Sequence, residues 1–184
     1  MTIFLKRYST VLSLFAMATL MLMGMRFIFH VIPMLNISHS EPVGLYLLDI
    51  DPAKKISRGD LVASCIPLDF ARLAFRRTYL KASDQCPGHV IPVLKRVYGI
   101  PGDDVDLTSQ GVLINGRMIQ NTGRLSRDTK NNQIPHVRCK GLLDGYILLA
   151  PNYHLSFDGR YFGLVSRQQI LGKATPLFTL RRVK

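Results

Sequence analysis

The feature that most constrains this chain is an uncharged, apolar run near its N-terminus. Residues 8–25 contain no Asp, Glu, Lys or Arg, and the run follows Lys6 and Arg7 directly. These 18 residues lie at the short end of the length that an α-helix needs to cross a bilayer. We therefore expect a cytoplasmic stub and uncleaved membrane anchor over residues 1–35, and one folded domain over residues 36–184. A cleaved secretory leader is the alternative, although the bulky residues 25–35 offer no small-residue cleavage site.

The charge balance is basic, with 24 Lys and Arg against 12 Asp and Glu. The basic residues are scattered and no nucleic-acid recognition motif accompanies them, so we expect a membrane lipid surface as a partner and no nucleic acid. Lys6 and Arg7 favour a cytoplasmic N-terminus, which places the folded domain on the other side of the membrane. Arg26 and His30 on the opposite flank oppose that orientation.

Three cysteines fit an oxidising compartment. Cys65 and Cys86 bracket 20 residues, and a bridge between them would stabilise the fold by roughly 3 kcal/mol. Cys139 could pair with either of them instead, and three reduced, buried thiols remain a further alternative.

Most of the folded domain consists of short β-branched runs between turns, which predicts a mainly antiparallel β fold. Asn115 and Gly116 form a dipeptide typical of a two-residue hairpin. Residues 68–81 instead repeat apolar side chains at helical spacing, so a small helical insert is expected within residues 66–85. Residues 121–138 are polar and rich in turn formers, and we expect an exposed loop there.

Lys95 is the strongest candidate for a general base. The alternation of its predicted strand places Lys95 on the same face as Val93 and Val97. Burial on an apolar face disfavours the charged amine, so the pKa of Lys95 should fall and the neutral amine could take a proton from a serine. A lysine that extends to solvent is the alternative. His39 adjoins Ser40, but neighbours on an extended strand point to opposite faces, which makes a serine–histidine pair awkward.

Metal chemistry has no support in the sequence. The five histidines are isolated and no Cys-x-x-Cys pair occurs, so we expect neither a metal nor another cofactor.

Three segments, in this order after the apolar run, resemble the signal peptidase I family of serine–lysine proteases. They are SHSEPVGLY at residues 38–46, LKRVYGIPGDDV at residues 94–105 and SFDGRYFGLV at residues 156–165. The Ser-x-Pro-x-Gly-x-Tyr spacing, the cysteine-flanked insert and the short chain most resemble the TraF-type conjugative-transfer peptidases within that family. Each segment is moderately specific, and the ordered set is strongly so.

The resemblance implies a role for each serine and for the lysine. It makes Ser40 the nucleophile and Lys95 the general base. It implies that the Ser38 hydroxyl helps the Ser40 amide to bind the oxyanion, a contribution worth roughly 3 kcal/mol where such donors have been removed elsewhere. Ser156 matches a serine that orients the lysine amine.

The last segment matches the family less completely. The resemblance implies that Asp158 and Arg160 form an ion pair, and that Asp158 is needed for activity. Gly159 replaces the usual serine between them. Pro42 follows Ser40 by two residues rather than three, which supports the TraF subgroup.

The resemblance also implies a setting. We expect a single-pass protein of the bacterial inner membrane, with a periplasmic peptidase domain that matures a precursor protein such as a conjugative pilin. Release by water gives a linear product, and attack by the substrate's own N-terminal amine gives a cyclic one. A general leader peptidase for many exported preproteins is the alternative, and a non-enzymatic assembly subunit of the transfer apparatus is a weaker one.

Overall fold

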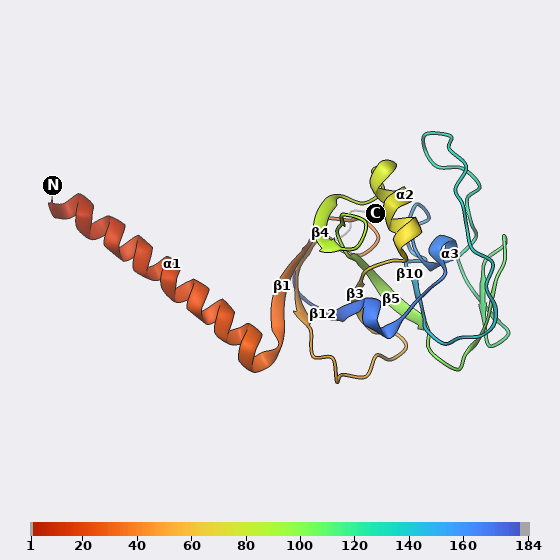
Figure 1. The fold of residues 1–184 in the computed structure, drawn as a ribbon, viewed down its shortest axis with the longest axis horizontal. Helices are drawn as coiled ribbons and strands as arrows, with labels where there is room; N and C mark the ends of the chain where they lie inside the picture. Colours follow the sequence, from red (N-terminus) through yellow and green to blue (C-terminus); the bar gives the residue numbers. More distant parts are fainter. Residues whose placement is uncertain (1, 181–184) are drawn as a thin grey trace.

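A computed structural model describes residues 2–180, apart from the side chains of residues 2–7, 9–10 and 25–29. Helix α1 (Thr2–Phe29) projects away from the folded domain (Figure 1). Within the part of the chain that the structure describes, no helix combines the length and apolar character needed to cross a membrane. The predicted roles of Lys6, Arg7 and Arg26 at the ends of the apolar run lie outside the described side chains.

The folded domain is built on two antiparallel sheets, which confirms the mainly antiparallel β prediction. The larger sheet has the order β1-β2-β12-β3-β5-β10-β11, and the smaller one has the order β8-β7-β6-β9. The large sheet contains β1 (Val31–Asn36), β2 (Gly44–Asp49), β3 (Leu61–Ser64), β5 (Val93–Gly99), β10 (Tyr146–Leu149), β11 (Leu164–Val165) and β12 (Ile170–Thr179). The small sheet contains β6 (Asp104–Leu107), β7 (Val112–Ile114), β8 (Arg117–Ile119) and β9 (Lys140–Leu142).

Strand β5 is the central element for the site. It lies between β3 and β10, with Val62 of β3 opposite Lys95 and Leu148 of β10 opposite Val97. Strand β1 lies at the end of the sheet order and pairs with β2. The domain boundary predicted between residues 35 and 36 thus falls within β1.

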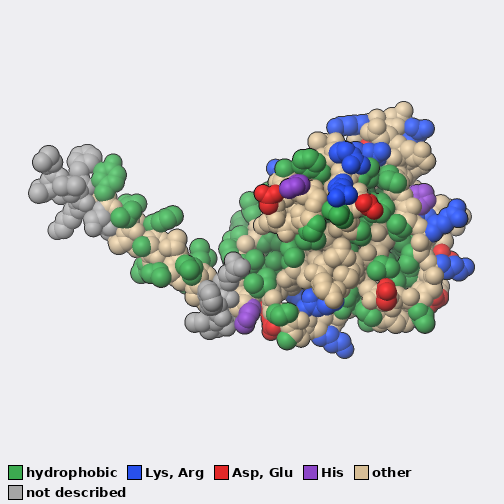
Figure 2. Space-filling view, viewed as in Figure 1, with side chains coloured by type: hydrophobic (Ala, Val, Ile, Leu, Met, Phe, Trp, Pro, Cys, Tyr) green, Lys and Arg blue, Asp and Glu red, His purple; other side chains and the backbone are tan. Residues whose placement is uncertain are grey.

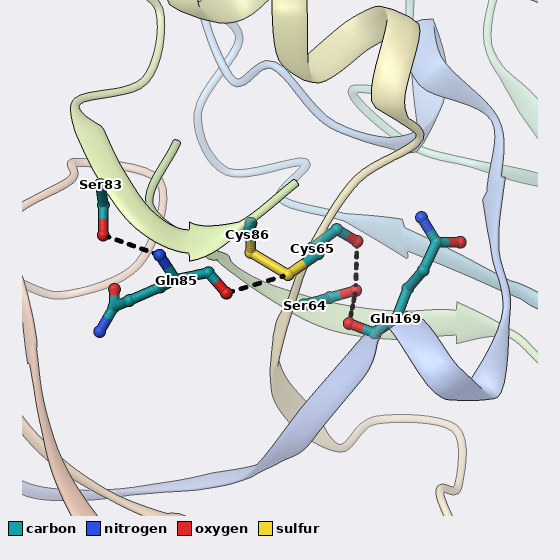
Figure 3. The surroundings of a disulfide bond; sticks show 6 residues. All are labelled: Ser64, Cys65, Ser83, Gln85, Cys86 and Gln169. Atoms are coloured by element: carbon teal, nitrogen blue, oxygen red, sulfur yellow. Dashed lines mark hydrogen bonds between the residues drawn. A yellow bond between two sulfur atoms is a disulfide. The ribbon is translucent and has the colours of Figure 1, made fainter. Parts of the chain in front are cut away.

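The cysteine-flanked insert contains α2 (Leu68–Arg76) and β4 (Ala82–Cys86). A disulfide joins Cys65 to Cys86, with 5.5 Å between their Cα atoms (Figure 3). The Cys65 amide donates to the Gln169 carbonyl at 2.8 Å, at the end of the 3-10 helix η1 (Arg167–Gln169). The base of the insert is therefore fixed both covalently and by the backbone that leads into β12.

The helix in the insert is shorter than predicted, because it ends at Arg76 instead of continuing to residue 81. Thr78 has a φ of 58°, a left-handed conformation that interrupts an α-helix. Tyr79 nevertheless packs against the core cluster that contains Ala71 and Ala74. The apolar spacing therefore persists beyond the helix because the chain turns back over the same core. Figure 2 shows Lys and Arg side chains gathered over the region of α2.

The two other local predictions are met. Asn115 and Gly116 connect β7 to β8, with φ values of 51° and 75° that fit the predicted two-residue turn. Residues 121–138 contain no named strand and are mostly exposed. This segment still packs inward through Ile134, which is buried, and through the Gln133 carbonyl, which accepts from Arg77 Nη1 at 2.8 Å.

Candidate active site

The centre of the candidate site is a buried pair formed by Ser40 and Lys95. Ser40 lies in the turn between β1 and β2, and Lys95 lies in the middle of β5. Each is 4% exposed, and Lys95 Nζ donates to Ser40 Oγ at 2.5 Å. The fold thus brings together two residues that are 55 positions apart in the chain.

Burial sets the protonation of Lys95. Removal of the amine from solvent lowers the pKa of Lys95 to about 8, because the charged form loses its hydration. The negative charges of Asp158 and Glu41 oppose this change, and the positive charge of Arg160 adds to it. About one-tenth of the lysine is therefore neutral at pH 7, and the nitrogen lone pair of this neutral form can accept a proton from a hydroxyl.

A single asparagine organises the turn that carries Ser40. The Asn36 side chain is buried at the end of β1, and its Oδ1 accepts from the Ser38 amide at 3.1 Å and the Ser38 hydroxyl at 2.8 Å. Its Nδ2 donates to the carbonyls of Ser38, Glu41 and Pro42 at 3.0 to 3.2 Å. Sequence reasoning missed Asn36, although an asparagine just before a serine-rich turn is a recognised turn former.

The second serine of this turn also faces the site. Ser38 Oγ lies 3.2 Å from Ser40 Oγ. The turn is held from its far side by Tyr46, whose hydroxyl donates to the Pro42 carbonyl at 2.7 Å. Ser38 and Ser40 are therefore presented together on a supported backbone.

Ser156 lies in the loop that follows β10. It lines the same cavity as Ser40 and Lys95, and its side chain is buried. Its hydroxyl has no hydrogen-bond partner within the described part of the chain. A buried hydroxyl in the same cavity as a lysine amine is a donor and acceptor available to that amine or to a bound molecule.

Asp158 and Arg160 form a buried ion pair behind Ser156. Arg160 Nε donates to Asp158 Oδ1 at 2.8 Å, and Nη2 donates to Oδ2 at 3.0 Å. Asp158 Oδ2 also accepts from the Ala150 amide at 3.0 Å, while Arg160 Nη2 donates to the Ser156 carbonyl at 3.1 Å. The pair therefore holds the loop that carries Ser156 against the end of β10.

The unusual Gly159 has a steric explanation. It begins the short helix α3 (Gly159–Phe162), where a Cβ atom would lie 2.8 Å from the Leu148 carbonyl oxygen of β10. Glycine therefore permits the close approach of α3 to the sheet, and a serine would need the backbone here to shift.

Two cavities flank the Ser40–Lys95 pair. The first has a volume of about 250 Å³ and is lined by the turn of Ser40, the loop of Ser156, residues 79–80 of the insert and parts of residues 125–134. The second has a volume of about 320 Å³ and runs between β1 and residues 91–95. Among the described residues, no group of three or more His, Cys, Asp and Glu side chains is arranged to hold a metal ion.

Comparison with known proteins identifies the family. The model of the signal peptidase family, peptidase S26, matches residues 5–178. The chain belongs to this family. The family resemblance predicted from the three sequence segments is thereby confirmed, and members of the family are membrane-associated peptidases that act on precursor proteins.

Relatives within the peptidase S26 family include conjugal transfer proteins. A conjugal transfer protein TraF of Agrobacterium fabrum (strain C58) is 31% identical over 145 residues, which cover 78% of this chain and 81% of that protein. A plasmid transfer protein TraF of Escherichia coli is 33% identical over 148 residues, with the same coverage of 78% and 81%.

Signal peptidases also match, over shorter stretches. A probable signal peptidase I-2 of a Synechocystis species is 32% identical over 85 residues, which cover 44% of this chain and 35% of that protein. A crystal structure of a signal peptidase I from Enterococcus faecalis V583 has 25% sequence identity and a TM-score of 0.37, and it covers 66% of this chain and 98% of that chain.

Proposed function

We propose that this peptidase S26 protein is a membrane-anchored serine endopeptidase that matures a precursor protein of a conjugative transfer system. The observation that carries the proposal is the buried contact of 2.5 Å between Lys95 Nζ and Ser40 Oγ, with the pKa of the lysine lowered to about 8. A neutral amine in contact with a hydroxyl is the arrangement that a serine nucleophile needs.

In the proposed acylation step, Ser40 Oγ attacks the scissile carbonyl carbon and neutral Lys95 takes the hydroxyl proton. The Ser40 amide and the Ser38 hydroxyl then donate to the oxyanion that forms, which requires Ser38 to release Asn36 Oδ1. When the intermediate collapses, the Lys95 ammonium gives its proton to the leaving amine. The acyl group of the substrate remains on Ser40 as an ester.

Deacylation reuses the same amine. Neutral Lys95 removes a proton from an attacking water, which releases a linear acid, or from the N-terminal amine of the substrate, which releases a cyclic amide. In both cases the proton returns to Ser40 Oγ. We propose that Ser156 orients the Lys95 amine through its unpartnered hydroxyl, and that Asp158 and Arg160 act as positioning residues through the loop they hold.

Membrane attachment is proposed through α1. Most of the described side chains of this helix are apolar and exposed, and Leu12, Phe15 and Leu20 are typical of them. Figure 2 shows hydrophobic side chains along the visible face of the helix. A helix that is apolar all round needs a protein core or a lipid environment, and α1 projects from the domain. We propose a single pass through the inner membrane with the peptidase domain in the periplasm, where the Cys65–Cys86 disulfide can form.

The proposed substrate class rests on the similarity to proteins named for conjugal transfer, which extends over 78% of this chain. A pilin precursor is the specific proposal, with cyclisation as one of the two outcomes. A general leader peptidase is the second candidate, favoured by the shorter similarity to signal peptidases. An assembly subunit without activity gives no role to the buried Ser40–Lys95 contact.

The test is co-expression of the protein with candidate pilin precursors and general preproteins, followed by mass spectrometry of the products. Ser40→Ala and Lys95→Ala should each abolish processing, whereas Lys140→Ala, at a side chain that is 82% exposed, should not. A product lighter than the linear peptide by one water would establish cyclisation. Processing that survives either substitution at the pair would reject the proposal.

A further inference from the structure

Leu80 is the residue of the cysteine-flanked insert that lines both cavities beside the proposed catalytic pair. The two cavities beside the pair share three lining residues, which are Ser38, Leu80 and Lys95. Ser38 and Lys95 belong to the turn and strand described above, whereas Leu80 comes from the insert. Its half-buried side chain therefore lies at the junction of the two cavities, beside the serine and the amine.

The backbone on both sides of Leu80 is held in place. On the N-terminal side, the Tyr79 amide donates to the Ala74 carbonyl at 2.9 Å. The Tyr79 hydroxyl donates to Asp128 Oδ2 at 2.6 Å, and its ring lies 5.2 Å from the ring of Phe157. On the C-terminal side, the Lys81 carbonyl accepts from the Ile91 amide at 3.0 Å. The hydrogen bonds on both sides of Leu80 therefore fix the position of its backbone.

The second cavity indicates which part of a substrate would contact Leu80. It is lined by residues 32–36 of β1, and β1 is an end strand of the sheet order. An end strand can accept an extended peptide as an additional strand, whose side chains then enter pockets alternately. A peptide bound along β1 with its carbonyl at Ser40 would direct the side chain of the acylated residue toward the junction with the first cavity.

We propose that Leu80 is a specificity-determining residue, which limits the side chain of the acylated substrate residue to a small one. This inference rests on the proposed function and adds to it the element that sets the size limit. The physical reason is steric: a branched side chain held at the junction leaves the acylated residue less room, and removal of three carbon atoms joins the two cavities. The Cys65–Cys86 disulfide closes the segment that carries Leu80.

The test measures kcat/KM for a series of peptides that differ only in the residue whose carbonyl is attacked, from Ala through Val and Leu to Phe. Leu80→Ala should raise the Leu-to-Ala ratio of kcat/KM by about tenfold or more, the scale expected for a few methylene groups in an apolar pocket. Leu80→Phe should lower the same ratio. Phe75→Ala is the matched control, because Phe75 lies in the same insert, is 45% exposed and lines neither cavity.

Opposite changes of the ratio in the two Leu80 variants cannot arise from loss of folding, which would lower every rate together. An unchanged ratio in both variants, with cleavage that still requires Ser40, would overturn the role of Leu80 and leave the proposed function intact. A change of the same size in Phe75→Ala would also overturn it. Cleavage that persists in Ser40→Ala would instead reject the proposed function itself.

Discussion

The pH dependence of cleavage tests the proposed base most directly. With the pKa of Lys95 at about 8, about one-tenth of the amine is neutral at pH 7 and about nine-tenths at pH 9. If the neutral amine takes the Ser40 proton, kcat/KM should rise about tenfold between these two pH values and level off above them. The assay is peptide cleavage by the full-length protein in detergent, with kcat/KM measured at half-unit steps of pH.

Glu41 provides a directional version of the same experiment. Its negative charge raises the pKa of Lys95, so Glu41→Gln should lower that pKa and move the rising limb of the profile toward lower pH. The variant should then be more active than the wild type at pH 7 and equal to it on the plateau. Asp106→Asn is the matched control, because Asp106 pairs with Lys140 in the small sheet. A flat wild-type profile, or a limb that moves to higher pH in Glu41→Gln, would refute the assignment of Lys95 as the base.

Three further predictions concern stability. Lys95→Met should remove activity and raise the free energy of unfolding by about 3 kcal/mol at pH 7, because the pKa of this lysine is about 8 in the fold against 10.5 unfolded. That gain should disappear as the pH rises from about 8 to above 10.5, and a gain independent of pH in denaturant titrations would contradict it. Replacement of Cys65 and Cys86 together by Ala should lower the free energy of unfolding by about 3 kcal/mol, as urea titration under oxidising conditions would measure. Gly44→Ala should lower the thermal midpoint strongly, because a Cβ there would lie 2.1 Å from the Phe178 carbonyl oxygen, and an unchanged midpoint would show that β12 can move away.

Local patterns predicted most strands of the large sheet and placed Lys95 on an apolar face, but they left extension of its amine to solvent as an alternative. The alternation of residues 93–97 places Lys95 on the same face as Val93 and Val97, and an amine buried there must lose its charge or find a partner. Its pairing with Ser40 could not be derived from alternation, because it depends on how the turn after β1 meets β5. The ordered resemblance supplied that link, and its catalytic meaning remains a prediction.

Long-range contacts account for what the sequence could not predict. The polar composition of residues 121–138 indicates exposure, yet Asp128 accepts from Tyr79, 49 positions away, and lines the first cavity. The apolar spacing of residues 68–81 indicates a longer helix, because a helical period does not reveal the left-handed turn at Thr78. Asn36 belongs to no periodic pattern, so its five hydrogen bonds could not be predicted from the sequence and depend on the folded turn.

The Asp158–Arg160 pair clarifies how a buried lysine can remain partly neutral close to a carboxylate. Asp158 raises the pKa of Lys95 and Arg160 lowers it, so their effects oppose each other and burial remains the largest influence. Both carboxylate oxygens of Asp158 accept hydrogen bonds from Arg160, whose positive charge offsets part of the effect of the carboxylate on the lysine. An unpaired aspartate at that position would favour the ammonium form of Lys95 and remove the proposed base. The pair can therefore hold the Ser156 loop against the sheet while Arg160 offsets part of the effect that Asp158 has on the amine.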